Sequence, residues 1–264
     1  MRAFGFDRAL VREPSESVVR GLRTGPHQPA YDRILAEHRA YVAALEAAGM
    51  AVEALPALAE HPDSIFVEDP AFVLGDAAIL LRPGAPSRLG EAAALAPALH
   101  RHFAHVAKVD GGFVDGGDIL VLPDEILIGL SARTDLAGAR RFGELVRELG
   151  QSVRIVETPP GILHLKTGCA LVDEGLVIAV PTLAPLFSGC EVLVPPAGEE
   201  AAASLLRVND HILMAAGFPR TAALLAGRGF DVVALPASEI ARIDAGLSCM
   251  SLRWLSGSGS PGRA

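Results

Sequence analysis

The feature that most constrains the fold is a pattern that repeats along the chain. Pairs of short apolar segments recur around turns near residues 76, 124, 174 and 210, which are 48, 50 and 36 residues apart. A helical stretch and one more apolar segment typically follow each pair. Repeats of about 35 to 50 residues that hold two strands, a helix and a strand favour a closed radial arrangement over a doubly wound sheet.

The expected elements can be placed along the chain. Strand pairs are predicted in 64–81, 119–130, 169–180 and 205–215, and single strands in 105–109, 153–156, 191–194 and 232–235. Helices are predicted over 89–102, 134–149 and 219–226, with Thr134 as the N-cap of the second. The strand 3–11, the helix 31–48 and the strand 251–254 predict a fifth unit that joins both ends of the chain.

No segment rich in Pro, Gly or Ser separates the units, so we expect residues 1–255 to form one α/β domain. Residues 256–264, with the linker-like sequence SGSGSPGRA, are expected to be a disordered tail.

Charge and hydropathy exclude several classes of protein. The net charge is −8 and the basic residues form no block, which argues against a nucleic-acid binder. The longest stretch without a charge, 175–190, has 16 residues and two prolines, whereas a membrane-spanning helix needs about 20 apolar residues. The N-terminus has no apolar run of the kind that a secretion signal contains, so we expect a cytoplasmic protein without membrane contact.

The cysteines and histidines give no metal motif. Cys169 and Cys190 lie in apolar segments and are expected in the core, and no CxxC pair is present. Cys249 differs, because its neighbours in GLSCMS are small and polar. His100, His102 and His105 would point in different directions from a helix, so no metal site is predicted.

Polar residues gather at the ends of the proposed strand pairs. Asp63, Glu68 and Asp69 precede the first pair, Asp115 the second, His164 and Lys166 the third, and Cys249 the C-terminal strand. In a closed radial repeat these ends converge on the axis, which would gather a thiol, an imidazole and several carboxylates in one pocket. For Glu68, Asp69 and Asp115 taken singly, a turn cap or a solvated acid is the preferred interpretation.

Six segments together resemble a known family. They are FVEDPAF (66–72), RPGAPSRLGE (82–91), DGGDIL (115–120), IGLSARTDLAGA (128–139), HLKTG (164–168) and IDAGLSCMSLRW (243–254). These segments resemble the dimethylarginine dimethylaminohydrolases, which belong to the guanidino-group-modifying superfamily. The resemblance runs from residue 1 to 254, and it implies a single-domain, five-bladed ββαβ propeller of the pentein type.

The resemblance also implies roles for individual residues. Cys249 would be the nucleophile, His164 the general acid and base, and Asp69 and Asp115 the groups that hold the guanidinium. The other implied substrate-binding residues are Arg88 and Arg133 at the carboxylate, Asp63 and Leu22 at the amino group, Phe66 at the aliphatic stem, Glu68 in support of the acidic end, and Ile243. Two positions depart from the family: Asp115 stands where other bacterial members have Glu, and residues 201–204 read AAAS instead of AANC.

The implied chemistry is consistent with these residue types. Two carboxylates can hold a guanidinium flat, a thiolate can add to its carbon, and an imidazole can protonate the departing amine and then activate water. This reaction requires no metal and no organic cofactor. Because carboxylates surround Cys249, we expect a neutral thiol with a raised pKa in the empty enzyme.

Several alternatives stay open from the sequence. An arginine deiminase or an amidinotransferase would use the same site, a cysteine amidase would share the Cys–His pair, and a binder of cationic amino acids would need neither residue. Lys166 stands where arginine deiminases have a second acid, so we expect methylated arginines to be preferred to arginine. The expected partners are a small guanidino amino acid as substrate and a second copy of the chain in a homodimer.

Overall fold

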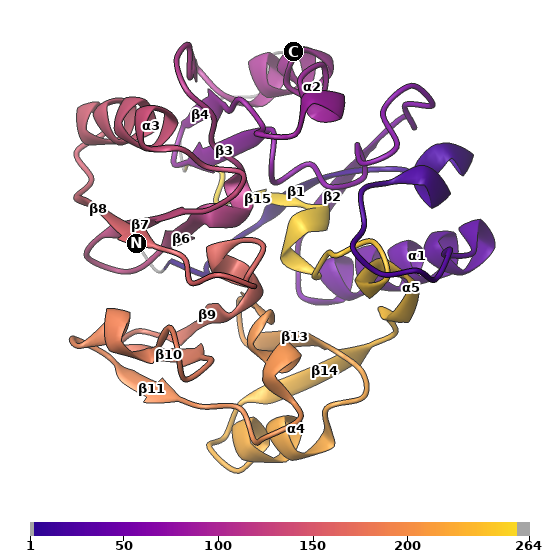
Figure 1. Cartoon of the computed structure of the whole chain (residues 1–264), viewed down its shortest axis with the longest axis vertical. Coiled ribbons are helices and arrows are strands. Elements are labelled where there is room, and N and C mark those ends of the chain that lie inside the picture. The colour runs from indigo at the N-terminus through magenta and orange to yellow at the C-terminus, as the bar shows by residue number, and fades with distance from the viewer. Residues whose placement is uncertain (1–2, 258–264) are drawn as a thin grey trace.

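The computed structural model describes residues 3–257, and these form five small sheets arranged around a common centre (Figure 1). Each sheet has three strands, in the orders β15–β1–β2, β3–β4–β5, β6–β7–β8, β9–β10–β11 and β12–β13–β14. The radial α/β architecture predicted from the repeat is therefore confirmed. Residues 258–264 of the expected tail lie outside the described residues.

The elements have the following bounds. The strands are β1 (Arg8–Arg12), β2 (Ala51–Leu55), β3 (Ala71–Leu74), β4 (Ala77–Leu80), β5 (His105–Lys108), β6 (Ile119–Val121), β7 (Ile126–Leu130), β8 (Val153–Glu157), β9 (Cys169–Asp173), β10 (Leu176–Ala179), β11 (Glu191–Leu193), β12 (Leu206–Val208), β13 (His211–Ala215), β14 (Asp231–Leu235) and β15 (Leu252–Trp254). The helices are α1 (Tyr31–Ala47), α2 (Glu91–His102), α3 (Leu136–Glu148), α4 (Pro219–Ala226) and α5 (Ser238–Ala241).

All five sheets share one connection pattern. The inner strand pairs antiparallel with the middle strand, and the middle strand pairs parallel with the outer one. A parallel pair needs a crossover connection, and helices α1, α2, α3 and α4 supply it in four units. In the unit of β9 to β11 a 3-10 turn, Ala184–Phe187, replaces the helix.

The chain ends close the ring. β15 pairs antiparallel with β1, so the last strand completes the sheet that the first strand begins. Inner strands of adjacent units are also in contact, as β15 is with β3 and β9 is with β6 and β12. The loops that precede the inner strands are consequently brought together near the centre of the molecule.

The structure corrects local predictions and adds two elements. The segment 64–70 forms turns, so the first strand pair begins only at Ala71. β2 and α5 were not predicted, because their apolar patterns are too short to stand out. Thr134 is not the N-cap of α3: Asp135 is, and its carboxylate accepts a hydrogen bond of 2.7 Å from the Gly138 amide.

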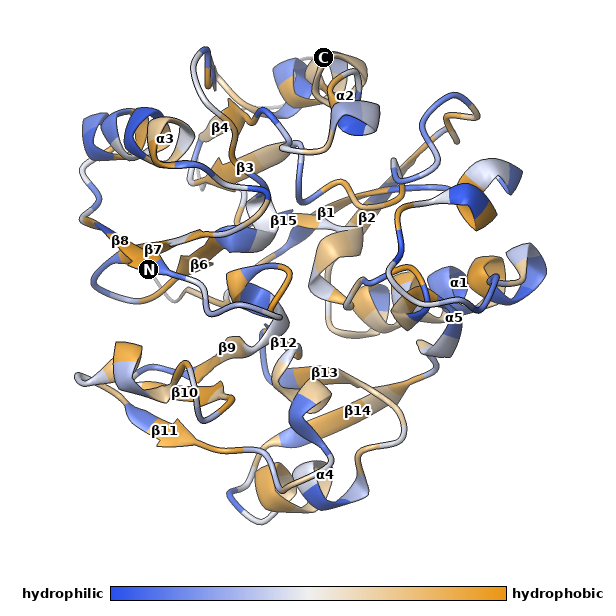
Figure 2. Cartoon of the chain, in the orientation of Figure 1, coloured by the Kyte–Doolittle hydropathy of each residue, from blue (hydrophilic) through white to orange (hydrophobic). Residues whose placement is uncertain are grey.

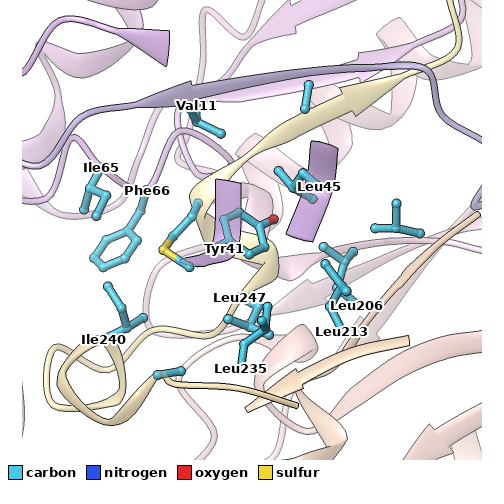
Figure 3. Packing of buried hydrophobic residues seen from close by; sticks show 14 of the residues in the cluster. Val11, Tyr41, Leu45, Ile65, Phe66, Leu206, Leu213, Leu235, Ile240 and Leu247 are labelled. Carbon is cyan, nitrogen blue, oxygen red and sulfur yellow. The ribbon is translucent and has the colours of Figure 1, made fainter. Parts of the chain in front are cut away.

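The buried hydrophobic side chains of the described residues form five clusters around the ring. Figure 2 shows that most strands are hydrophobic, whereas helices α1 and α3 are hydrophobic on one side and hydrophilic on the other. In the largest cluster the ring of Tyr41 lies between Phe66 and Ile240 on one side and Leu206 and Leu213 on the other (Figure 3). Cys249 packs against the same cluster, so its position depends on this core. Among the described residues, no helix is long and apolar enough to span a membrane.

Asn209 joins two units of the ring. It occupies the turn between β12 and β13 in a left-handed conformation (φ 51°) that Asn tolerates better than most residues. Its Oδ1 accepts a hydrogen bond of 2.8 Å from the Phe6 amide, and its Nδ2 donates to the carbonyl oxygens of Phe6 (2.9 Å) and Ala48 (2.8 Å). This side chain therefore connects the fourth hairpin to the unit that holds both chain ends.

We expect Asn209→Gly to lower the free energy of unfolding by about 2–3 kcal/mol, because three hydrogen bonds to the backbone are lost. Asn209→Ala should cost roughly 1 kcal/mol more, because alanine disfavours a positive φ. Urea unfolding measures both, with the exposed neighbour Asp210→Ala as the control. An Asn209→Gly variant as stable as the wild type would contradict this role.

Candidate active site

A small cavity of about 40 Å³ lies where the loops before the inner strands converge. It is lined by Leu22, Asp63, Phe66, Asp69, Arg88, Asp115, Arg133, Leu163, His164, Ile243, Asp244, Ala245 and Cys249. Ten of the eleven site residues predicted from the sequence belong to this lining, and Glu68 does not. Leu22 and Cys249, which are 227 residues apart in sequence, thus meet in one place.

The polar groups occupy corresponding positions in their units. Asp69 ends the turn before β3, Asp115 precedes the short turn before β6, His164 caps the turn before β9, and Cys249 lies in the turn before β15. In the remaining unit this position holds small residues near Ser204. Gly246 packs directly on Ser204, because a Cβ at residue 246 would lie 2.4 Å from the Ser204 Oγ.

His164 and Asp115 form a buried pair. The His164 Nε2 lies 3.0 Å from the Asp115 Oδ2, and the two residues are 8% and 0% exposed. The Asp115 Oδ1 accepts a hydrogen bond of 2.7 Å from the Gly84 amide, which fixes the carboxylate. Burial opposes the charged imidazole, but the bond to Asp115 and the charges of Asp69 and Asp118 outweigh it and raise the pKa of His164 to about 9. His164 is therefore an imidazolium at neutral pH.

Asp69 is held by Arg88. The Asp69 Oδ2 lies 2.5 Å from the Arg88 Nη1, and the Oδ1 accepts a hydrogen bond of 2.9 Å from the Gly117 amide. Burial raises the pKa of Asp69, but Arg88 and His164 more than offset it and lower the pKa to about 2. The other Arg88 donors bind Glu91 and the carbonyl oxygens of Asp63 and Phe66.

The Cys249 thiol lies beside this charged pair. Burial, followed by the negative charges of Asp69 and Glu68, raises the pKa of Cys249 to about 12, while a backbone hydrogen bond from Gly246 and the charge of Lys166 act in the opposite direction. The direction agrees with the expectation from the sequence. In the empty site the sulfur is a neutral thiol at neutral pH.

Glu68 and Lys166 pair with each other behind the lining of this cavity. The Lys166 Nζ lies 2.7 Å from the Glu68 Oε1, and the Arg253 Nη2 donates to the same oxygen at 2.9 Å. Glu68 therefore does not present its carboxylate to the cavity, and Lys166 neither points into solvent nor lines it. Any effect of Lys166 on substrate choice must act through Glu68.

Comparison with known proteins identifies the family. The family model for eukaryotic N,N-dimethylarginine dimethylhydrolases matches residues 16–180. A relative in Pseudomonas aeruginosa, N(G),N(G)-dimethylarginine dimethylaminohydrolase, is 36% identical over 255 residues, which are 94% of this chain and all of the relative. The chain belongs to the dimethylarginine dimethylaminohydrolase family. The protein of the same name in Streptomyces coelicolor is 35% identical and covers 93% of this chain and 96% of its own length.

Solved structures agree with this assignment. The Pseudomonas aeruginosa dimethylarginine dimethylaminohydrolase, as a Cys-to-Ser mutant complexed with citrulline, superimposes with a TM-score of 0.92 at 36% identity and covers 95% of this chain and all of its own. The N-terminal domain of ArgZ, a cyanobacterial arginine dihydrolase, reaches a TM-score of 0.83 at 19% identity over 94% of this chain and 97% of its own, which shows the shared fold alone.

The structure adds Asp118 to the residues that organise the site in this chain. Its Oδ1 accepts a hydrogen bond of 2.8 Å from the Leu165 amide, next to His164, and its Oδ2 accepts from Ser131 and Thr134, each at 2.7 Å. Thr134 in turn accepts from the Asp115 amide at 3.1 Å. Asp118 is the last residue of the DGGD motif, so the motif itself was the available signal.

The two glycines of DGGD are required by close contacts. A Cβ on Gly116 would lie 1.9 Å from the Glu68 carbonyl oxygen, and one on Gly117 would lie 2.6 Å from the His164 Nδ1. Any other residue would push the imidazole or the Glu68 backbone away.

Asp69, Asp115 and His164 also have the spacing of a metal site. One possible ligand atom from each lies within 4.8 Å of the others. A metal ion would require that His164 lose its proton and that Asp69 separate from Arg88, whereas a guanidinium requires only the carboxylates. The residues present therefore fit an organic cation better than a metal ion.

We expect the alkylation rate of Cys249 in the empty enzyme to rise about tenfold per pH unit from pH 6 to 9, because the thiolate is the reactive form. Iodoacetamide labelling followed by peptide mass spectrometry measures this rate, and Cys249→Ser reports the background from Cys169 and Cys190. A plateau that begins near pH 6 would show that the empty site already holds a thiolate, which would contradict the raised pKa.

Proposed function

We propose that this chain hydrolyses N-ω-methylated arginines to citrulline and methylamines through a covalent intermediate on Cys249. The observation that carries this proposal is the combination of a thiol, an imidazolium and two buried carboxylates around one small cavity. Relatives named dimethylarginine dimethylaminohydrolase, and the related structure with bound citrulline, support the same substrate class. Cytoplasmic location, a homodimeric state and a single catalytic domain over 1–255 stay predictions.

In the proposed complex the substrate guanidinium lies between Asp69 and Asp115. Both carboxylates are fixed by backbone amides, from Gly117 and Gly84 respectively, so they are oriented before the substrate arrives. Phe66 lines the cavity and would pack on the aliphatic stem.

The amino-acid end of the substrate would lie at the rim. The Leu22 amide donates a hydrogen bond of 2.9 Å to Asp63, and the Thr24 amide donates one of 2.6 Å to Asp244, so the loop after Gly21 is held against the cavity. Arg133 is half-buried at this rim and forms no ion pair within residues 3–257, whereas the donors of Arg88 are bound to protein atoms. We therefore assign the substrate carboxylate to Arg133, and to Arg88 the positioning of Asp69.

The first chemical step joins sulfur to carbon. A bound guanidinium adds a positive charge beside Cys249 and so favours the thiolate: the thiol gives its proton to solvent, because His164 is already protonated, and the sulfur attacks the guanidinium carbon. As the S–C bond forms, the bond from carbon to the methylated nitrogen breaks. His164, with a pKa of about 9, holds the proton that the departing amine takes.

The second step consumes one water. The neutral His164 accepts a proton as the water oxygen attacks the thiouronium carbon. The S–C bond then breaks and sulfur leaves as the thiolate, which takes the remaining hydroxyl proton; this restores the thiol and leaves the urea group of citrulline.

Methylated substrates fit this site better than arginine. Glu68 is not part of the lining of this cavity, and its Oε1 is paired with Lys166 and Arg253, so it presents no carboxylate to a second edge of the guanidinium. Arginine would bury N–H donors that lack acceptors, whereas a dimethylated nitrogen carries none.

The test is the release of citrulline and amine from asymmetric dimethylarginine, monomethylarginine and arginine. We expect kcat/KM for arginine to be about ten- to a hundredfold below that for the methylated substrates, which corresponds to roughly 1–3 kcal/mol for unsatisfied buried donors. Cys249→Ser should be inactive towards all three. Arginine turned over as well as dimethylarginine would favour a deiminase instead.

A further inference from the structure

A second, larger cavity lies behind the active site. It has a volume of about 470 Å³ and is lined by parts of all five inner strands and by the N-terminal residues around Phe4 and Phe6. Glu68 and Lys166 line this rear cavity and not the front one. The two cavities therefore approach the centre of the ring from different directions.

The wall between the cavities is one residue thick. Glu68, Gly116 and Ser248 line the rear cavity, and their direct neighbours in sequence, Asp69, Asp115 and Cys249, line the front one. Lys166, which follows His164 by two residues, also lines the rear cavity. Each group proposed to act on substrate is thus backed by a residue that faces the rear cavity.

The wall contains buried polar atoms that the protein does not satisfy. The Glu68 Oε2 and the Arg253 Nε are buried and have no hydrogen-bond partner within residues 3–257. One is an acceptor and the other a donor, on side chains joined to each other by the 2.9 Å bond through the Glu68 Oε1. Buried polar groups of this kind are normally satisfied by ordered water.

We propose that the rear cavity supplies the hydrolytic water, which passes through the wall beside Glu68 and Arg253 to the carbon bound to Cys249. This inference rests on the proposed function, since it concerns the second step of that reaction.

The front entrance is poorly suited to deliver this water. Its cavity holds only about 40 Å³, and in the intermediate the amino-acid portion of the substrate stays attached to Cys249 and fills it. The water must reach the side of the carbon from which the amine left. We place that side toward Asp69 and Asp115, because their sequence neighbours Glu68 and Gly116 line the rear cavity.

The rear cavity has lining residues that can be enlarged without touching the catalytic groups. Val73 of β3 and Val121 of β6 are half-buried and line it. The series Val121→Leu, Val121→Phe and Val121→Trp fills the cavity progressively, Val73→Trp fills it from another strand, and Val121→Ala keeps it open.

The experiment follows the covalent adduct during a single turnover by acid quench and intact mass. We expect formation of the adduct to change less than about twofold in every variant, because the front cavity is untouched. Decay of the adduct should slow with the size of residue 121, by at least about tenfold in Val121→Trp, and Val73→Trp should act likewise. Val121→Ala should decay at the wild-type rate.

The outcomes separate the two proposals. An adduct that forms in the wild type but decays at the same rate in all folded Val121 and Val73 variants would overturn the rear supply of water and leave the proposed function intact. Absence of citrulline and of any adduct in the wild type would overturn the proposed function itself. The leucine variant changes volume least, so it provides a folded member of the series if tryptophan is not tolerated.

Discussion

The structure depends on the burial of charged side chains in compensated pairs around the axis of the ring. Asp69 is paired with Arg88, Asp115 with His164, and Glu68 with Lys166 and Arg253. An isolated buried charge would cost several kcal/mol, so each partner is required for the other. The same pairing fixes the two carboxylates before substrate arrives, keeps His164 protonated and leaves Cys249 as a thiol until a cation is bound.

Much of this arrangement could be predicted from the sequence. The spacing of the apolar strand pairs indicated the closed ring, and the positions of Asp69, Asp115, His164 and Cys249 before inner strands indicated a shared site. These predictions succeeded because the apolar pattern of a strand and the spacing of a repeat can both be read directly from the sequence. The family resemblance then gave roles to residues whose chemistry was already consistent with them.

The remaining features depend on the direction in which side chains point, which cannot be predicted from a local sequence pattern. Glu68 and Asp69 are adjacent, but Glu68 lines the rear cavity and Asp69 lines the front one. The donors of Arg88 are consumed by Glu91 and by backbone carbonyls, which sequence alone could not distinguish from a free guanidinium. Thr134 looked like a helix cap, yet its buried side chain donates a hydrogen bond to Asp118 and accepts one from the Asp115 amide.

The proposed mechanism depends on a covalent bond between the Cys249 sulfur and the substrate carbon. The most direct measurement is the intact mass of the enzyme after acid quench during turnover of dimethylarginine. The proposed mechanism predicts an adduct with the mass of the substrate less dimethylamine, located on the peptide that contains Cys249. Once formed, this adduct should decay more slowly in His164→Gly, where no imidazole remains to activate water. Normal turnover by Cys249→Ser, with no adduct in the wild type or in His164→Gly, would contradict it.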